Sequence, residues 1–521
     1  MRALELLQGI SFDLICGEPE TFVSDITDDS RCVMPGCVFI CISGDVHNGH
    51  DYIEDALARG AVGVIVSESL SSDMILSLRH RDCFAIFVYD IEACIGRLCN
   101  NFLDWPSRRL KLVGVTGTKG KTTTACMIRH MLDSCNYGCG LIGTLGIDTG
   151  SGIVSTQNTT PSCVTIHKAL AEMVKNGLSY CVIEVSSQGI MRDRIAGLIF
   201  DTGVFTNISY DHVGKNEHKA FEEYYRWKSH LITKCKNIVI GSDDIYLAGL
   251  AAGIKDAGSY VREVSTEKEC EGEAFLLTYG ISSGNVRAVN PQNIVSGEKG
   301  IQSFTLELNS RTINTVNVSL PGMCNVENAL AAICVSFIYG LTLDMISSSL
   351  ENVVVPGRME YVHVSDKFMV VIDYAHNNMS LINALNTLRE YTAGKIICVF
   401  GCGGNRARHR RLGMGEASGL YADVTVITSD NPRYEPPIEI MHDIKTGVEK
   451  AGGSYVMIED RKEAIRYALS HAQEGDVVLL AGKGHETYQE ICGRRLPMNE
   501  RELIADILKE DKDGVICGCN N

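Results

Sequence analysis

The 521-residue sequence predicts an α/β protein of three domains. At a usual size of roughly 150 residues per domain, this length accommodates three of them. Buried apolar runs alternate with helical segments from residue 110 onward, and a second such series begins near residue 355. This alternation indicates mostly parallel sheets with right-handed crossovers. The breaks in the pattern place the domains at residues 1–104, 105–345 and 346–521.

The overall composition argues against two classes of protein. The net charge is −16, from 48 basic and 64 acidic residues, whereas a nucleic-acid-binding protein needs a basic face. No run of 18 or more apolar residues is present, and the N-terminus lacks the pattern of an export signal. The 21 cysteines are scattered through apolar runs, as expected for reduced, buried side chains. We therefore expect a cytoplasmic protein with neither a nucleic-acid partner nor membrane insertion.

The first 104 residues predict a small α/β domain. Apolar runs that are typical of buried strands alternate here with polar helical segments. These runs are VFICI, AVGVIV and CFAIFVY. Trp105-Pro106-Ser107 then interrupts the pattern and indicates a linker.

The central domain begins with a strand, a glycine-rich turn and a helix, in the order LKLVGV, TGTKGKT and TTTACMIRHMLD. This arrangement directs backbone N–H groups and a helix N-terminus at an anion, with Lys121 against the outer phosphates and Thr122 toward Mg²⁺. The match to G-x-x-x-x-G-K-[ST] is imperfect, because Val115 stands where the first glycine is expected. Further buried strands are SYCVIEV, TGVFTNI and KNIVIG. An antiparallel region is expected over 265–320, followed by the long helix NVENALAAICVSFIYG.

Several charged side chains lie near this loop in the sequence, and those at strand ends are candidates for a metal site. Glu184 ends one buried strand, and either a paired core acid or a Mg²⁺ ligand is consistent with that position. Asp211 and His212 end the next strand, and Mg²⁺ occasionally accepts imidazole. Lys228 lies in the amphipathic segment FEEYYRWKSHL, which by itself indicates a surface helix.

The C-terminal domain predicts a second open sheet with ligand-binding loops. Its strands FMVVIDY, GKIICVFG, ADVTVITSD and DVVLLAG end in the segments DYAHNN, GCGGNRARHRR, SDNPRYEPP and AGKGHET. Ligands on such sheets bind beyond the carboxyl ends of the strands. One such segment could be a solvated turn, but four at one edge favour a binding site.

Taken together, these motifs resemble the Mur ligase family. The likeness covers nearly the whole chain, and the family's motifs occur in order. They are TGTKGKTT, GTLG, NTTPS, EVSSQG, FTNIS with DH, LPGMCNVENALAA, VPGRME, DYAH, GCGGNR, SDNPR and AGKGHE. Residues 24–66 resemble the family's UDP-sugar-binding domain, and valine before the glycine turn is the family's normal text. The resemblance implies an N-terminal UDP-binding domain, a central P-loop ATPase-like domain and a C-terminal Rossmann-like domain.

The resemblance also implies an ATP-dependent amide ligase of peptidoglycan synthesis and cell-wall biogenesis. ATP would convert the D-Glu carboxylate of UDP-MurNAc-L-Ala-D-Glu to an acyl phosphate, which meso-diaminopimelate then attacks. The implied cofactor is Mg²⁺, and the implied state is a monomer. This chemistry requires neutralisation of charge around the transferring phosphoryl group.

Residue roles follow from the matching motif positions. The catalytic residues would be Lys121, Glu184, His212 and Lys228. ATP would contact Gly117, Thr118, Lys119, Gly120, Lys121, Thr122, Thr123, Asn325, Arg358, Asp373 and His376. Mg²⁺ would be served by Thr122, Glu184, His212 and Lys228, with Lys228 carbamylated to N6-carboxylysine. The UDP-MurNAc-dipeptide would contact Ser30, Thr159, Thr160, Ser186, Arg192 and Arg194. Diaminopimelate would contact Arg406, Asp430, Asn431, Pro432, Arg433, Gly482 and Glu486.

The choice of amine rests on the text D-N-P-R, which in this family marks members that take meso-diaminopimelate. Arg433 would grip the distal carboxylate bidentately, and Glu486 would face the distal ammonium. Gln188 and the lengthened segment between Asp211 and Lys228 depart from the family's usual text. These departures leave open L-lysine, or another amine or acceptor.

Three other functions agree less well with this sequence. Folylpolyglutamate synthetase shares the ATP loop but not the N-terminal domain or SDNPR. A nucleotide-dependent switch ATPase would not need the strand-end residues of the last domain. A non-catalytic paralogue would not need Lys121, Glu184, His212 and Lys228, all of which are present.

Overall fold

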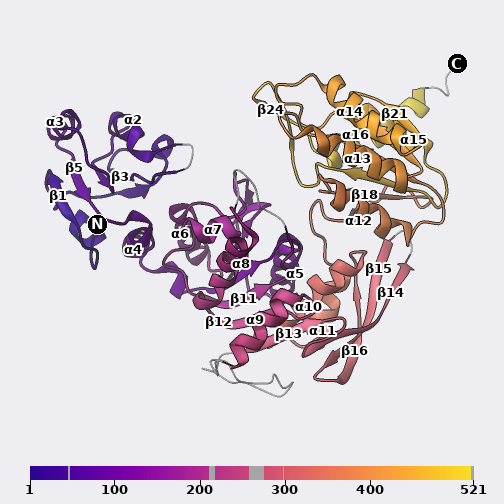
Figure 1. Ribbon diagram of the computed structural model, residues 1–521, viewed down its shortest axis with the longest axis horizontal. Coiled ribbons are helices and arrows are strands. Elements are labelled where there is room, and N and C mark those ends of the chain that lie inside the picture. Colours follow the sequence, from indigo (N-terminus) through magenta and orange to yellow (C-terminus); the bar gives the residue numbers. More distant parts are fainter. Residues whose placement is uncertain (45–46, 211–217, 257–274, 297–298, 518–521) are drawn as a thin grey trace. The chain divides into compact units, whose positions relative to one another are not determined.

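The computed structural model describes residues 1–44, 47–210, 218–256, 275–296 and 299–517 (Figure 1). The chain forms two compact units. The first comprises Met1–Asn285 and Ala331–Thr342, and the second comprises Val286–Leu330 and Leu343–Asn521. Within the described ranges, no helix combines the length and the apolar character needed to cross a membrane. The cysteines in these ranges are free, and most of them are buried, as expected from their apolar surroundings.

The N-terminal part of the first unit is a five-stranded sheet in the order β1-β5-β4-β3-β2. All neighbours are parallel except β1 and β5. The strands are β1 (Asp13–Cys16), β2 (Asp25–Thr27), β3 (Cys37–Ile40), β4 (Gly63–Val66) and β5 (Phe84–Phe87). The helices are α1 (Ala3–Leu6), α2 (Ile53–Ala58), α3 (Ser72–His80) and α4 (Ile91–Leu103). Both faces carry apolar cores, so the predicted small α/β domain is confirmed.

A larger sheet forms the centre of the first unit, with β13-β12-β11-β6-β10-β7 parallel throughout. Two short antiparallel strands, β8 and β9, follow β7. The strands are β6 (Lys111–Thr116), β7 (Cys139–Gly143), β8 (Gly146–Asp148), β9 (Ile153–Val154), β10 (Tyr180–Glu184), β11 (Phe200–Phe205), β12 (Cys235–Gly241) and β13 (Leu276–Gly280). The predicted parallel strands are therefore confirmed.

Helices cover this central sheet and carry several candidate residues. They are α5 (Lys121–Ser134), α6 (Cys163–Lys175), α7 (Ser187–Met191), α8 (Phe221–His230) and α9 (Ile245–Asp256). Side chains of β6, β10, β11 and β12 pack with those of α6, α8 and α9 in one core. The core fixes the strands, so the residues at their carboxyl ends lie at one edge.

The second unit contains an antiparallel meander and a six-stranded sheet. The meander strands are β14 (Val286–Ser296), β15 (Lys299–Leu308) and β16 (Arg311–Val318), which are antiparallel as expected. The expectation of an antiparallel region over all of 265–320 is wrong for β13, which lies in that range and pairs in parallel with β12. Two helices follow, α10 (Met323–Ile338) and α11 (Leu343–Glu351), and the first of them is the long helix predicted from the sequence.

The six-stranded sheet has the order β17-β18-β22-β19-β20-β21 and is parallel except for β17. Its strands are β17 (Glu360–Tyr361), β18 (Met369–Asp373), β19 (Ile396–Phe400), β20 (Val424–Ile427), β21 (Tyr455–Met457) and β22 (Val477–Ala481). A hairpin, β23 (Tyr488–Ile491) and β24 (Arg494–Pro497), follows.

Helices lie on both faces of this sheet, in the orange and yellow part of Figure 1. They are α12 (Asn378–Arg389), α13 (Arg408–Tyr421), α14 (Pro437–Lys450), α15 (Arg461–His471) and α16 (Glu500–Cys517). The first three share one apolar core with the sheet, and the last two share a core on the other face. This three-layer arrangement is the predicted Rossmann-like type of architecture.

Candidate active site

The glycine turn between β6 and α5 has a backbone that only glycine fits well. Gly117 has a φ of 154° and Gly120 a φ of 83° at the N-cap of the helix. A Cβ on Gly117 would lie 1.8 Å from the Oγ1 of Thr206. The turn therefore packs closely against Thr206 and ends at the N-terminus of α5. The backbone N–H groups at a helix N-terminus attract an anion.

Two lysines converge on this turn. The Nζ of Lys121 donates to the carbonyl oxygens of Gly117 (2.8 Å) and Thr118 (3.2 Å). The Nζ of Lys228 donates to the same Gly117 carbonyl at 2.7 Å and lies 4.9 Å from the ring centre of Tyr224. Lys228 is only 2% exposed, so the interpretation of this side chain as a lysine at the surface of its helix is wrong. The two ammonium groups make the loop strongly electropositive, which suits phosphate.

Glu184 is a buried carboxylate at the end of β10, 1% exposed. Its Oε2 accepts from the hydroxyl of Thr122 at 2.8 Å, and its Oε1 accepts from the backbone N–H of Thr144 at 2.8 Å. A Cβ on Gly143 would lie 2.3 Å from Oε1, so glycine leaves the space that this carboxylate fills. The hydrogen bonds compensate the burial of the charge and hold it beside the loop.

The Thr122 hydroxyl and the Glu184 carboxylate are oxygen donors of the kind that Mg²⁺ prefers, and they lie side by side. The ammonium of Lys228 has no lone pair, so it could serve a cation only after carbamylation supplied oxygens. His212 lies outside the described residues. Within the described ranges, no group of three or more His, Cys, Asp and Glu side chains is arranged for a metal.

The residues assigned to the dipeptide gather around Thr160, which is buried. The Oγ1 of Thr160 donates to the Glu184 carbonyl at 2.8 Å and accepts from the Ser186 N–H at 3.0 Å. The Nη1 of Arg194 donates to the Thr160 carbonyl at 2.8 Å. Burial and the neighbouring Arg192 lower the pKa of Arg194. These four residues therefore lie together with Glu184.

Thr159 and Ser30 occupy two other places in the first unit. The hydroxyl of Thr159 lies 3.1 Å from that of Thr144, which links it to the Glu184 group. Ser30 begins a short 3₁₀ helix, Ser30–Cys32, in the N-terminal sheet region. The sequence analysis missed Asp28 beside it, whose carboxylate accepts from Ser162 at 3.2 Å. Burial raises the pKa of Asp28.

In the second unit, Asp373 ends β18 and organises two loop segments. Its Oδ2 accepts from the Met359 N–H and its Oδ1 from the Ala375 N–H, both at 2.8 Å. Burial raises the pKa of Asp373, and the cationic Arg358 opposes that shift. Arg358 itself lies over the ring of Tyr374, 4.6 Å from its centre. Arg358 and Asp373 are thus held together by the fold.

Two histidines lie on either side of Tyr374, with ring-centre distances of 4.7 Å for His376 and 4.9 Å for His485. Burial, followed by the charges of Arg410 and Arg358, lowers the pKa of His376. The turn from Asp373 to His376 was predicted from the sequence, whereas His485 was not, although it lies in the motif AGKGHET. Asn325, the remaining nucleotide candidate, donates to the Pro321 carbonyl at 2.7 Å.

Arg433 has a φ of 55°, a conformation that costs free energy for a residue with a side chain. Its backbone N–H donates to the Glu490 carbonyl at 3.0 Å, and its carbonyl accepts from Cys492 at 2.7 Å. Its Nε donates to the Glu490 carboxylate at 3.1 Å and its Nη1 to the Gly404 carbonyl at 2.7 Å. The hairpin thus holds both the backbone and the guanidinium.

Asn431 and Glu486 are joined directly. The Nδ2 of Asn431 donates to the Oε2 of Glu486 at 2.9 Å. The Oδ1 of Asn431 accepts from the Nζ of Lys483 at 2.9 Å and from the Glu490 N–H at 2.9 Å. Two of the predicted amine-site residues therefore form one network with Lys483, which the sequence analysis did not single out.

The other predicted amine-site residues lie on the same loops. Gly482 has a φ of 104°, and a Cβ there would lie 3.1 Å from the Oδ2 of Asp430. A Cβ on Gly404 would lie 1.9 Å from the Pro432 carbonyl, so these two loops pack backbone to backbone. Arg406 is exposed. The seven predicted residues thus come from three neighbouring loops at the carboxyl ends of β19, β20 and β22.

Comparison with known proteins identifies this arrangement. Residues 115–336 match the Mur ligase middle domain, and residues 357–484 match the Mur ligase glutamate ligase domain. A UDP-N-acetylmuramoyl-L-alanyl-D-glutamate--2,6-diaminopimelate ligase of Caldanaerobacter subterraneus subsp. tengcongensis is 38% identical over 98% of this chain and 100% of its own length. The chain belongs to the Mur ligase family.

Two further matches agree with this assignment. The Clostridium perfringens protein of the same name is 36% identical over 97% of this chain and 99% of its own. A solved structure of a ligase of that name is 27% identical, with a TM-score of 0.66, covering 98% of this chain and 99% of that one. The Mur ligase likeness therefore includes the N-terminal region outside the two matched domains.

A buried ion pair of this Mur ligase supports the loops that carry the predicted amine-site residues. Arg461 begins α15 and Glu500 begins α16, and they meet at 2.7 Å with both side chains almost fully buried. Arg461 also donates to the carbonyls of Ser429 (3.3 Å) and Ala481 (3.0 Å). No local feature marks this role, because Arg461 stands beside other charged residues at the start of its helix.

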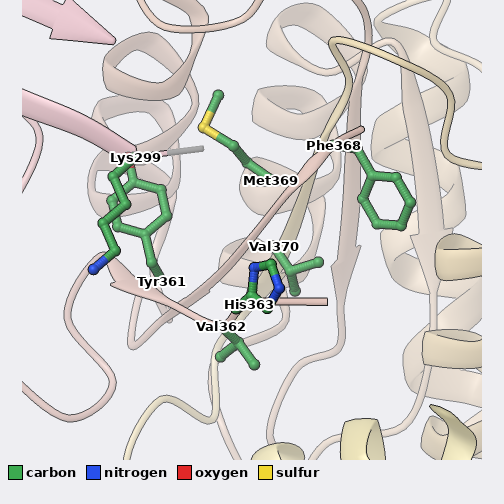
Figure 2. Close-up of a pocket in the computed structure, with 7 residues that line it drawn as sticks. All are labelled: Lys299, Tyr361, Val362, His363, Phe368, Met369 and Val370. Carbon is green, nitrogen blue, oxygen red and sulfur yellow. The ribbon is translucent and has the colours of Figure 1, made fainter. Parts of the chain in front are cut away.

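A cavity of 330 Å³ in the second unit is lined by residues that were not predicted as site residues (Figure 2). Its lining includes Lys299, Tyr361, His363 and Phe368, and it reaches the first residues of β18. Asp373 ends that strand, so the cavity is at the opposite end from the candidate residues. Ligands of parallel sheets bind at the carboxyl ends, so this cavity is not the candidate active site.

Proposed function

We propose that this Mur ligase joins meso-diaminopimelate to the D-Glu carboxyl group of UDP-MurNAc-L-Ala-D-Glu at the expense of ATP. The observation that carries the proposal is the placement of Arg433. Its guanidinium is held by Gly404 and Glu490, while its Nη2 has no hydrogen bond to any residue of the described ranges. A planar, permanently charged group of this kind suits a distal carboxylate, which L-lysine lacks.

In the first step, a carboxylate oxygen of D-Glu attacks the γ-phosphorus of ATP, the bond to the bridging oxygen breaks, and ADP leaves. Lys121 and the backbone amides at the N-terminus of α5 would stabilise the charge of the phosphoryl group during transfer. Bound Mg²⁺ would neutralise phosphate charge, held by Thr122, Glu184, His212 and a carbamylated Lys228. Positioning and charge compensation are the main contributions of protein residues to this type of reaction.

In the second step, the amine nitrogen attacks the acyl carbon, the tetrahedral intermediate expels phosphate, and the nitrogen loses a proton. Arg433 and Glu486 would hold the distal carboxylate and ammonium, so that the other amino group is free to react. Asn431, Asp430, Pro432, Gly482 and Arg406 would complete that site. The nucleotide would also contact Asn325, Arg358, Asp373 and His376.

The proposal assigns residues 1–104 to the UDP-sugar, 105–345 to ATP, and 346–521 to the amine. Ser30, Thr159, Thr160, Ser186, Arg192 and Arg194 would contact the UDP-MurNAc-dipeptide. We place the enzyme in the cytoplasm, where ATP is supplied, and propose that it acts as a monomer, because one chain contains every assigned residue.

The test combines purified protein, ATP, Mg²⁺ and UDP-MurNAc-L-Ala-D-Glu with either diaminopimelate or L-lysine, and measures phosphate release and product mass. We expect one phosphate per amide product, with diaminopimelate strongly preferred. A preference for lysine would contradict the role of Arg433. ATP hydrolysis without any amide product would refute the ligase and favour the switch ATPase.

A further inference from the structure

We propose that Lys483 is a positioning residue that orients the Glu486 carboxylate toward the distal ammonium of the amine substrate. The inference rests on the proposed function. Lys483 follows β22 and is 0% exposed. A lysine is rarely buried completely unless a partner compensates its charge. Lys483 lies in one of the loops that carry the predicted amine-site residues. The hydrogen bonds of its ammonium group, however, all go to protein atoms.

The ammonium of Lys483 has three N–H groups and three acceptors. These are the Oδ1 of Asn431 at 2.9 Å, the Oε2 of Glu486 at 2.7 Å and the carbonyl of Tyr488 at 2.6 Å. Since every proton has a partner, Lys483 has no donor left for a ligand. Its effect on a substrate therefore has to pass through the side chains that it holds.

Lys483 contacts the Glu486 carboxylate through only one of its two oxygens. Its Oε2 accepts from both Lys483 and the Nδ2 of Asn431, at 2.7 and 2.9 Å. Its Oε1 has no hydrogen bond to any residue in the described part of the chain. Two donors on one oxygen fix the plane of the carboxylate, and the other oxygen keeps its capacity to accept from an ammonium group.

Charge supports the same conclusion. Arg433 is paired with Glu490, and Lys483 is paired with Glu486, so the two cations and two carboxylates of this group balance. A distal centre that carries both an ammonium and a carboxylate adds no net charge to this balance. Loss of Lys483 would leave the half-buried Glu486 carboxylate without its cation, and an unpaired charge that is partly shielded from water is costly.

The test compares two amine substrates that differ only in the distal amino group, meso-diaminopimelate and 2-aminopimelate. We expect the wild-type enzyme to prefer diaminopimelate in kcat/KM. In Lys483→Met, kcat/KM for diaminopimelate should fall roughly tenfold to hundredfold, the usual effect of losing a charged hydrogen bond. The kcat/KM for 2-aminopimelate and the KM for ATP should stay close to the wild-type values. The preference for diaminopimelate over 2-aminopimelate should therefore fall to about that of Glu486→Gln.

Lys462→Met serves as a control, since Lys462 is at the surface of the same unit and pairs with Glu510. An equal loss for both amines in Lys483→Met would overturn the positioning role while leaving the proposed function intact. Absence of any diaminopimelate product with the wild type would overturn both.

A paired variant keeps the test decisive if Lys483→Met does not fold. Lys483→Gln/Glu486→Gln leaves no uncompensated charge and is compared with Glu486→Gln alone. We expect the same substrate preference in both, because Lys483 acts through a carboxylate that is absent from each. A further selective loss on diaminopimelate in the double variant would overturn the proposal.

Discussion

The hydroxyl of Thr122 and the carboxylate of Glu184, 62 residues apart in the sequence, meet at 2.8 Å. Thr122 belongs to the first turn of α5, and Glu184 ends β10, the strand next to β6. The parallel register between β6 and β10 brings the end of one strand to the loop that follows the other. A phosphate-binding loop and an acidic group thus share one edge of the sheet.

Glu184→Gln should lower turnover roughly a hundredfold to a thousandfold, because an amide keeps the shape but removes the negative charge beside the loop. The thermal unfolding midpoint should change little, since the glutamine oxygen can still accept from the Thr144 N–H and its amide NH₂ can donate to the Thr122 hydroxyl. Phosphate release over a Mg²⁺ titration measures the effect, with Glu172→Gln on the exposed face of α6 as control. Unchanged turnover would exclude Glu184 from catalysis.

Gly117→Ala should abolish measurable ATP binding. The added Cβ would lie 1.8 Å from the Thr206 hydroxyl, and the φ of 154° disfavours alanine. The matched control is Gly249→Ala in α9, where a Cβ meets nothing within 4 Å. That control should bind ATP normally and gain helix stability of about 1 kcal/mol. Nucleotide titration by calorimetry distinguishes the two, and normal binding by Gly117→Ala would contradict the assigned loop.

Arg433→Lys should raise the KM for diaminopimelate about tenfold to hundredfold, because a single ammonium cannot form two parallel hydrogen bonds to a carboxylate. The KM for ATP should stay near the wild-type value. Steady-state kinetics with each substrate varied in turn tests whether only the KM for diaminopimelate changes. Arg466→Lys on the surface of α15 serves as the control. A parallel rise in both KM values would refute a role confined to the amine.

His485 predicts a pH dependence of stability. Burial, followed by the charges of Arg358, Arg501 and Lys483, lowers its pKa to about 4 from 6.5. Between these values the unfolded chain binds a proton that the folded chain excludes, so stability falls as the pH falls through this window. The loss at pH 5 is about 2 kcal/mol.

Thermal unfolding at pH 7.5 and pH 5 measures this effect in wild type and in His485→Gln. The decrease in midpoint on acidification should be a few degrees smaller in the variant, because it lacks the buried imidazole. Replacement of the exposed His442 by glutamine should leave the decrease as in wild type. Identical decreases in all three proteins would show that His485 titrates normally.

The α/β class, the parallel strands and the phosphate loop were all predictable from the amino-acid sequence alone. Continuous apolar runs such as those of β6 and β10 have to be buried on both faces, and glycine with lysine after such a strand has few other uses. The family motifs also predicted roles for Arg433 and Glu486 from the sequence, because each motif consists of a few consecutive residues.

Which side chains contact one another became visible only in the folded structure. The helical segment around Lys228 is amphipathic and predicts exposure, yet packing buries Lys228 against the Gly117 carbonyl. Lys483 and Arg461 likewise carry no local mark of their roles. A hydrogen bond between residues far apart in sequence depends on strand order and register, and a buried cation becomes recognisable only when its acceptors are in place.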